Sequence, residues 1–503
     1  MDSGRRRGGG WVLPVALLAV AAGSAAGAVV LDGDEASAAR GDGAAVTTPV
    51  LSARRVPELL AEPVAARRLT ADLDAWLGRS PADTCLVVED AGQAVYERNP
   101  AAPLAGASTQ KLLTATALLL ALGPDSTFET SAVAAQAPSG GVIAGDLFLV
   151  GGGDAALGTP GWLAGTPGDR PRAIHDVNAL VDAIAAAGVT RIEGSVVGDG
   201  SRYDDQRYQA SLAPRLVDQD QVGPIGGLMV NDGFAGFSTA RSFESTVPAA
   251  DPASDAARVL TDLLRTRGIT VAGEPRAGRA PEGAAEVATL TSPPMSQVVA
   301  EMLTNSDNET AEAAVKEIGL SVSGEGTWAA GFAGVTRLLG EAGVPLDGVA
   351  VADGTGLSID SKLTCATLVD VLTRPETGPV IRDGLAVAGE TGTLAESWDG
   401  TAAEGRLRAK TGTLRNATAL AGEIEVNGGG TVAFAYVANV PEPGEVTAAG
   451  VGLTGLADVL MAYPRGVDVA PLGPAAVPGQ DAAAPTEPTA GAAAADPGAT
   501  PGG

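Results

Sequence analysis

Residues 108–122 read STQKLLTATALLLAL and are followed by Gly123-Pro124. The stretch is apolar on most of its faces and ends at a Gly-Pro pair, so it predicts a helix buried in the centre of a domain. Ser108 and Lys111 stand three positions apart, which places both side chains on one face of the first turn. A lysine that loses its charge through burial is a base for a serine nucleophile. The alternative is a helix-capping serine beside an exposed lysine, because this spacing also arises by chance.

Apolar runs separated by turn residues predict strands on both sides of this helix. The expected strands are 85–88, 94–96, 406–413, 417–426 and 431–440. The first two form a hairpin around Asp90-Ala91-Gly92, and the last two are joined by Asn427-Gly428-Gly429-Gly430, a strong hairpin signal. We therefore expect one five-stranded antiparallel sheet flanked by helices, an α/β (α+β) arrangement.

Residues 141–290 differ from the sequence on either side in their pattern of expected strands and helices. Short strand-like pieces alternate there with helical stretches, for example 145–150 with 177–187. We therefore expect a smaller inserted α/β domain at 141–290, which divides a larger domain into residues 61–140 and 291–467.

The two ends of the chain have the composition of non-globular segments. Three arginines at 5–7 precede residues 11–31, which carry no charge. This pattern is typical of a secretory signal, but the run is also long enough for a membrane anchor, so residues 1–31 are expected to be one or the other. Either one predicts export to the cell envelope. Residues 32–60 are expected to be a linker, and residues 468–503, rich in Ala, Pro and Gly, a disordered tail.

Composition excludes several classes of function. The chain has 503 residues and a formal net charge of −27, which disfavours nucleic-acid binding. Its single histidine, His175, argues against a Ser-His-Asp triad or a histidine-rich metal site, so we expect no metal and no cofactor. Lysine occurs only four times. Lys316 and Lys362 lack chemically informative neighbours, so we expect them to face solvent.

Two further short motifs follow in the sequence. Ser306-Asp307-Asn308 interrupts a helical region. Its purely structural interpretation is a helix N-cap at Ser306. Lys410-Thr411-Gly412-Thr413 falls on an expected strand. An exposed cation and hydroxyls beside a glycine suit the docking of an extended peptide with its carboxylate, since the glycine leaves room for close backbone approach. Each motif is weak alone. SxxK, SxN and KTGT in this order form a known active-site set.

With these motifs the sequence resembles the D-alanyl-D-alanine carboxypeptidase/endopeptidase family, peptidase family S13, which comprises low-molecular-mass class C penicillin-binding proteins. The resemblance spans roughly residues 67–463. Its supporting stretches are 96–99, 107–114, 145–154, 353–358 and 408–414. It implies a penicillin-binding/β-lactamase-like transpeptidase domain, and a serine carboxypeptidase or endopeptidase that acts on peptidoglycan stem peptides and is inhibited by β-lactams.

The resemblance also implies catalytic roles. Ser108 would attack the carbonyl between two D-alanines, and Lys111 would take its proton. Ser306, hydrogen-bonded between the two lysines, would relay a proton to the leaving amine. Asn308 would hold the substrate amide, and Lys410 would help to lower the pKa of Lys111 and attract the terminal carboxylate.

The KTGT strand would bind the substrate. Thr411 and Thr413 would assist Lys410 with the carboxylate, next to Gly412. The backbone N–H groups of Ser108 and Thr413 would form the oxyanion hole. β-Lactams would acylate Ser108 and leave slowly. Two alternatives remain, a β-lactamase and a non-catalytic cell-wall-binding protein, and the balance of carboxypeptidase, endopeptidase and transpeptidase activity stays open.

Some positions depart from the family pattern or are ambiguous. Ile359 stands where the family commonly has arginine, which leaves stem-peptide side-chain specificity open. Asp204 and Asp205 read as ordinary loop acids. Thr391-Gly392-Thr393 repeats the TGT letters without a lysine and reads as a decoy. A Cys85–Cys365 disulfide is compatible with an exported protein but does not follow from sequence.

Overall fold

The structure is a computed structural model that describes residues 56–81, 83–165, 175–237, 246–441 and 452–464. The expected signal or anchor, most of the expected linker and the expected tail lie outside these residues. Helix α2 (Val56–Leu77) begins within the last part of the expected linker. In the part of the chain that is described, no helix is both long and apolar enough to cross a membrane.

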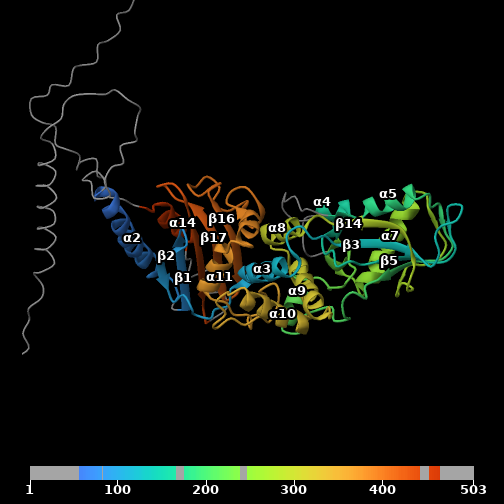
Figure 1. Ribbon diagram of the computed structural model, residues 1–503, viewed down its shortest axis with the longest axis horizontal. Coiled ribbons are helices and arrows are strands. Elements are labelled where there is room, and N and C mark those ends of the chain that lie inside the picture. The colour runs from blue at the N-terminus through green and yellow to red at the C-terminus, as the bar shows by residue number, and fades with distance from the viewer. Residues whose placement is uncertain (1–55, 82, 166–174, 238–245, 442–451, 465–503) are drawn as a thin grey trace, which may run out of the picture. The chain divides into compact units, whose positions relative to one another are not determined.

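One antiparallel sheet has the strand order β15-β16-β17-β18-β1-β2 (Figure 1). Its strands are β1 (Asp83–Asp90), β2 (Gln93–Arg98), β15 (Ala386–Val387), β16 (Leu407–Leu414), β17 (Ala417–Glu425) and β18 (Thr431–Asn439). The five strands expected from the sequence are all present. The sheet has a sixth strand, so the expected count of five was one too low. This strand is β15, which pairs with Ala409 and Arg408 at the edge of the sheet. Two residues are too few to carry a periodic sequence signal.

Side chains of this sheet alternate between two apolar layers. Cys85 and Val87 on β1 join the core that contains α3, whereas Leu86 and Val88 join the core that contains α2 and α14 (Leu453–Met461). Successive residues of a strand point to opposite faces, so a continuous apolar run on β1 is what a sheet covered on both faces requires.

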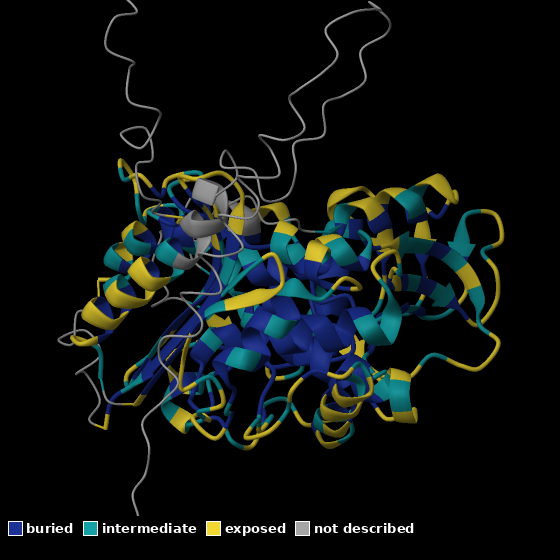
Figure 2. Cartoon of the chain, turned by 60° about the vertical axis from the view of Figure 1, so that its left-hand side comes forward, coloured by how far each residue is buried: buried dark blue, intermediate teal, exposed yellow. Residues whose placement is uncertain are grey.

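Helix α3 (Gln110–Leu122) lies in the first of these cores. Its residues from Gln110 to Leu119 are all buried, as predicted for a central helix, and it belongs to the dark blue interior of Figure 2. The helix is preceded by a 3-10 turn, η1 (Ala107–Thr109), so Ser108 stands just before the α-helix rather than inside it. Packed with α3 are α8 (Met295–Asn305), α9 (Asn308–Ser323), α10 (Trp328–Glu341), α11 (Cys365–Thr373) and α12 (Gly378–Asp383).

A disulfide joins Cys85 on β1 to Cys365 at the start of α11. The two Cα atoms are 5.9 Å apart, and both side chains are fully buried. The pairing that the sequence left open is therefore present, across a separation of 280 residues. It ties helix α11 to β1, the strand between β18 and the edge strand β2.

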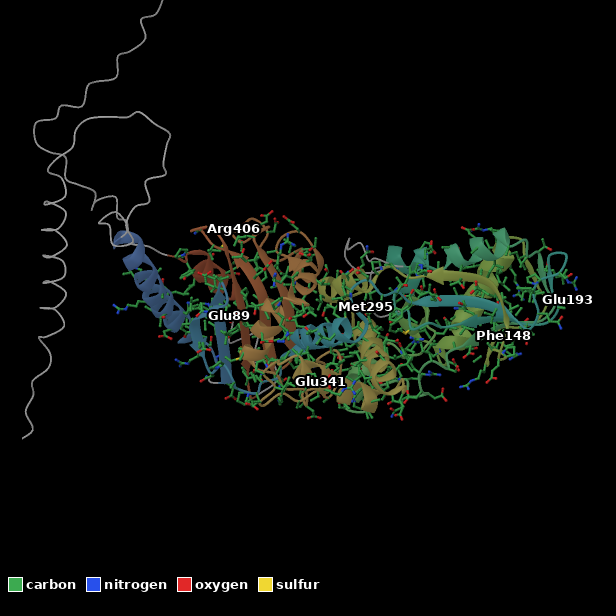
Figure 3. The ribbon with its side chains drawn as sticks, in the orientation of Figure 1. Glu89, Phe148, Glu193, Met295, Glu341 and Arg406 are labelled. Atoms are coloured by element: carbon green, nitrogen blue, oxygen red, sulfur yellow. A yellow bond between two sulfur atoms is a disulfide. The ribbon has the colours of Figure 1, made fainter. Side chains whose placement is uncertain are left out.

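A second, mixed sheet has the order β13-β9-β5-β3-β14. Its central strands β5 (Leu147–Val150) and β9 (Val196–Asp199) are parallel, and β3 (Glu129–Ala134) is antiparallel to both β5 and β14 (Ala285–Thr291). Helices α5 (Asn178–Ala186) and α7 (Pro252–Thr266) contribute to its core. Strand β3 precedes residue 141, so this sheet also draws on residues before the expected insertion. Figure 3 labels Phe148 on β5 and Met295 at the start of α8.

The remaining elements are short. They are β4 (Val142–Ile143), β6 (Leu157–Gly158), α4 (Pro160–Gly165), β7 (His175–Asp176), β8 (Arg191–Ile192), α6 (Pro214–Asp218), β10 (Phe234–Gly236), β11 (Val247–Pro248), β12 (Thr270–Val271) and β13 (Arg276–Ala277), with 3-10 turns at Asn231–Gly233 and Gly392–Leu394 (η4).

Candidate active site

Lys111 is fully buried in the first turn of α3 and touches three oxygen atoms. Its Nζ lies 3.3 Å from Ser108 Oγ and 2.7 Å from Asn308 Oδ1. It also donates a hydrogen bond to the backbone oxygen of Thr355 at 3.0 Å. All three acceptors are uncharged. The structure thus brings together the first motif and the asparagine of the second, whereas the resemblance had placed Ser306 beside the lysine.

Burial lowers the pKa of Lys111 from 10.5 to about 8. The carboxylates of Asp353 and Asp307 oppose this shift, and desolvation of the ammonium outweighs them. At pH 7 about a tenth of Lys111 is then neutral and ready to accept a proton.

The Ser306-Asp307-Asn308 motif forms the break between α8 and α9. Ser306 ends α8 in a left-handed conformation, with φ 60° and ψ 38°. Asp307 is the residue that caps α9, since its Oδ1 accepts a hydrogen bond from the Thr310 N–H at 3.0 Å. The helix cap is therefore Asp307 and not Ser306. A left-handed serine is strained backbone of the kind that clusters at functional sites. The sharp break starts α9 with Asn308 directed at Lys111.

Asn308 is held at both ends of its amide. Its Oδ1 accepts from Lys111, and its Nδ2 donates to the backbone oxygen of Gln221 at 2.6 Å. The next residue of the helix, Glu309, accepts from the Gly223 N–H at 2.7 Å. The segment that follows α6 is thus fixed directly to the start of α9. Sequence reasoning missed Gln221, because a backbone carbonyl leaves no signature in the residue type.

The KTGT strand β16 lies against the turn that carries Ser108. A Cβ placed on Gly412 would meet the backbone oxygen of Gly106 at 2.5 Å and the Cβ of Ala107 at 3.2 Å. Close approach was the expected reason for this glycine, and within the structure the chain's own backbone uses that space. The result is that the strand passes beside the nucleophile turn.

The side chains of β16 differ in exposure. Lys410 is fully buried, so the expectation of an exposed cation was wrong, and its Nζ donates to the Thr411 backbone oxygen at 3.0 Å. Buried apolar layers lie on both faces of this sheet, so a side chain on β16 can be covered by elements far away in the sequence. Thr411 is half-buried and Thr413 is exposed.

Lys316 on α9 contradicts the expectation of a solvent-facing side chain. It is fully buried, with Nζ 2.6 Å from Asp204 Oδ1, 2.6 Å from the Gln206 backbone oxygen and 3.9 Å from the ring centre of Trp328. Asp204 is therefore an ion-pair partner rather than an ordinary loop acid, whereas Asp205 is exposed. Lys362, the fourth lysine, is half-buried.

A buried carboxylate supports the loop that supplies the Thr355 oxygen. Glu312 on α9 accepts from the Gly354 N–H at 3.0 Å and from Trp328 Nε1 at 2.7 Å. Burial raises the pKa of Glu312 to about 7. Asp353 accepts from Thr355 Oγ1 at 2.6 Å and from Ser358 N at 3.0 Å. These contacts fix the 353–358 stretch beside Lys111. The residue types of this stretch did not predict that role.

Two further positions from the sequence analysis are His175 and Ile359. His175 bonds Asp154 at 2.7 Å near the second sheet. Among the described residues, no group of three or more His, Cys, Asp or Glu side chains is arranged to hold a metal ion. Ile359 follows the 353–358 stretch and is 54% exposed, which is unusual for a large apolar side chain.

A serine just before a helix and a buried lysine in the first turn of that helix, which packs against an antiparallel sheet, are features of serine enzymes with a penicillin-binding or β-lactamase-like fold. The sequence profile of the D-Ala-D-Ala carboxypeptidase 3 (S13) family matches residues 69–244 and 238–455. The chain belongs to this family, which confirms the resemblance read from its motifs.

Known proteins agree with this assignment. A carboxypeptidase of Mycobacterium tuberculosis is 32% identical over 365 residues, covering 70% of this chain and 75% of that protein. A D-alanyl-D-alanine carboxypeptidase of Actinomadura sp. (strain R39) is 30% identical over 486 residues, covering 80% and 87%. Penicillin binding protein 4 (dacB) of Haemophilus influenzae shares the fold, with a TM-score of 0.62, 19% identity and coverage of 78% and 99%. Its complex with a β-lactam gives a TM-score of 0.56 at 18% identity, with coverage of 77% and 98%.

Proposed function

We propose that this S13 family member is a serine-type D-Ala-D-Ala carboxypeptidase and DD-endopeptidase of peptidoglycan stem peptides, with Ser108 as nucleophile and Lys111 as base. The observation that carries the proposal is the 3.3 Å contact between Ser108 Oγ and the Nζ of a fully buried lysine. Relatives of 30% and 32% identity that are named carboxypeptidases support the same activity.

Acylation begins with the neutral form of Lys111. Its Nζ takes the proton of the Ser108 hydroxyl while Ser108 Oγ attacks the carbonyl between the two terminal D-alanines. The backbone N–H groups of Ser108 and Thr413 face the oxygen that gains charge. Ser306 relays a proton to the leaving nitrogen, the C–N bond breaks, and an ester on Ser108 remains.

Water then hydrolyses the ester, which releases the shortened peptide and restores the hydroxyl of Ser108. The substrate lies along β16 between Asn308, which holds its amide, and Thr411 and Thr413, which hold its carboxylate. Gly412 brings this strand against the Ser108 turn, so the two halves of the site are adjacent. An endopeptidase step differs only in the amine that leaves, because both reactions pass through the same acyl-enzyme.

Mass spectrometry of the purified protein with benzylpenicillin tests the nucleophile. A β-lactam opened by Ser108 leaves a covalent adduct, so wild type should gain one penicillin mass and Ser108→Ala none. Ser201→Ala is the matched control, since Ser201 is exposed and lies outside the site. A wild-type protein without an adduct would contradict the proposal, and rapid release of hydrolysed penicillin would indicate a β-lactamase instead.

We also propose that the chain is exported, with residues 1–31 as a cleaved signal or a membrane anchor. The arginines followed by an uncharged run support export, and so does the buried Cys85–Cys365 disulfide, since disulfides persist in oxidising compartments. Fractionation of cells expressing the full chain, with sequencing of its mature N-terminus, separates the two forms. Recovery of the uncleaved chain in the cytoplasm would contradict export.

A further inference from the structure

The loop between β15 and β16 places a second threonine beside the KTGT motif. Thr411 Oγ1 donates a hydrogen bond to Thr393 Oγ1 at 3.0 Å. Thr393 lies in the Thr391-Gly392-Thr393 stretch, which repeats the TGT of the motif without its lysine and was not expected to take part in the site. The two threonines are 18 residues apart in sequence, and the residue pattern does not predict the contact of their hydroxyls.

This loop is built rigidly around Thr393. Gly392 has φ 56°, and a Cβ there would lie 2.0 Å from the Thr304 backbone oxygen, two residues before Ser306. Thr391 Oγ1 accepts from the Val387 N–H at 2.9 Å. Leu394 is 1% exposed and packs into the apolar layer shared with α2 and α14. Thr393 therefore sits between two anchored neighbours, and its position does not depend on the substrate.

We propose that Thr393 is a positioning residue for the carboxylate of the substrate, acting through Thr411. This inference rests on the proposed function, in which Thr411 donates to that carboxylate. A hydroxyl has one hydrogen and two lone pairs. In the free enzyme the hydrogen of Thr411 points to Thr393. When a carboxylate arrives, that hydrogen turns to the anion, and the hydroxyl of Thr393 donates to the lone pair of Thr411.

The exchange keeps one hydrogen bond between the two threonines and adds the bond from Thr411 to the carboxylate. Thr411 changes from donor to acceptor toward Thr393, and no proton leaves either oxygen. Thr393 thereby stabilises the donating orientation of Thr411, which is the orientation that an anion requires. Hydrogen bonds to charged groups are the stronger kind, so the benefit falls on ligands that carry the carboxylate. Ligands that lack this group gain nothing from Thr393.

Thr393→Val, which removes the hydroxyl at nearly constant shape, tests this directly. Two probes are compared: benzylpenicillin, which acylates Ser108 and carries a carboxylate, and an arylboronic acid without a carboxylate, which also bonds Ser108. We expect acylation efficiency by penicillin to fall about tenfold and the boronic acid affinity to stay within about twofold. Thr393→Ser keeps the hydroxyl and should restore acylation to near the wild-type value.

A double-mutant cycle with Thr411→Val completes the test. If Thr393 acts through Thr411, adding Thr393→Val to Thr411→Val should bring no further loss. Thr336 is an exposed threonine on a helix, so Thr336→Val is the control for replacing a threonine by valine. Unchanged acylation in Thr393→Val would overturn the proposal, as would equal losses for both probes or additive losses in the cycle. Failure of the proposed function is distinct, since wild type itself would then form no adduct.

Discussion

Lys111 on α3 and Lys316 on α9 are both fully buried. The groups that contact each amine determine which protonation state its surroundings favour. Lys111 touches a hydroxyl, an amide oxygen and a backbone oxygen, all of them uncharged. Lys316 touches the carboxylate of Asp204 and the face of Trp328. Burial lowers the pKa of both, but at Lys316 the opposing charge of Asp204 acts through direct contact. The first environment favours a base, whereas in the second the carboxylate of Asp204 favours the protonated amine.

The roles of the two regions follow from this difference. A neutral amine beside Ser108 completes a nucleophile, so the start of α3 serves the reaction. The charged amine on α9 joins that helix to the segment around residue 204, which leads toward Gln221 and its contact with Asn308. The middle of α9 therefore serves the architecture that presents Asn308 to the site.

The strongest test of this contrast is Lys111→Met. The variant keeps a long side chain in the pocket but removes the base, so the rate of Ser108 acylation by penicillin should fall about a thousandfold. Stopped-flow or mass-spectrometric time courses measure the rate, and the melting temperature checks that the variant is folded. A folded variant with wild-type acylation would show that another group takes the serine proton.

The pH dependence of acylation examines the same lysine without a mutation. With a pKa of about 8, the neutral fraction of Lys111 increases as pH rises. Acylation by penicillin should therefore rise about fiftyfold from pH 6 to pH 8 and level off above pH 9. The sign is fixed because the deprotonated amine is the active form. A rate that is flat over this range would mean that Lys111 already loses its proton well below pH 6 or is not the base.

Lys316→Met examines the architectural lysine. It leaves Asp204 without its partner, but that carboxylate is about a third exposed and can be hydrated, so the loss is smaller than for a sealed pair. We expect the free energy of unfolding to fall by about 2 kcal/mol, measured by urea titration, with acylation changed by less than about threefold. Lys362→Met, at a half-buried site, is the matched control and should stay within about 0.5 kcal/mol. A loss of acylation as large as that of Lys111→Met would erase the distinction between the two lysines.

Much of the fold and part of the site could be predicted from sequence because their signals are local. Alternation and turn residues predicted the five main strands, and the spacing of Ser108 and Lys111 predicted their contact. The contact of Lys111 with Asn308 joins residues 197 apart and was not predicted, because the resemblance placed Ser306, and not Asn308, next to the lysine.

The remaining features depend on partners that no local pattern announces. Lys316 finds Asp204 across 112 residues, so its burial could not be inferred from its neighbours. Lys410 was expected to be exposed, because the residues around it do not show that buried apolar layers lie on both faces of its sheet. Thr393 needed the fold before its hydroxyl could be placed beside Thr411.

The smallest expected effect concerns Trp328, which contacts Lys316 directly and the loop beside Lys111 only through Glu312. Trp328→Phe keeps an aromatic face over Lys316 but removes the Nε1 hydrogen bond to Glu312 at 2.7 Å. Glu312 keeps its bond from the Gly354 N–H, so its carboxylate remains partly satisfied. We expect the free energy of unfolding to fall by about 1 kcal/mol, with acylation by penicillin unchanged within about twofold. If acylation fell markedly while stability held, Glu312 would transmit the environment of α9 to the loop beside Lys111, and the two lysines would form one coupled system.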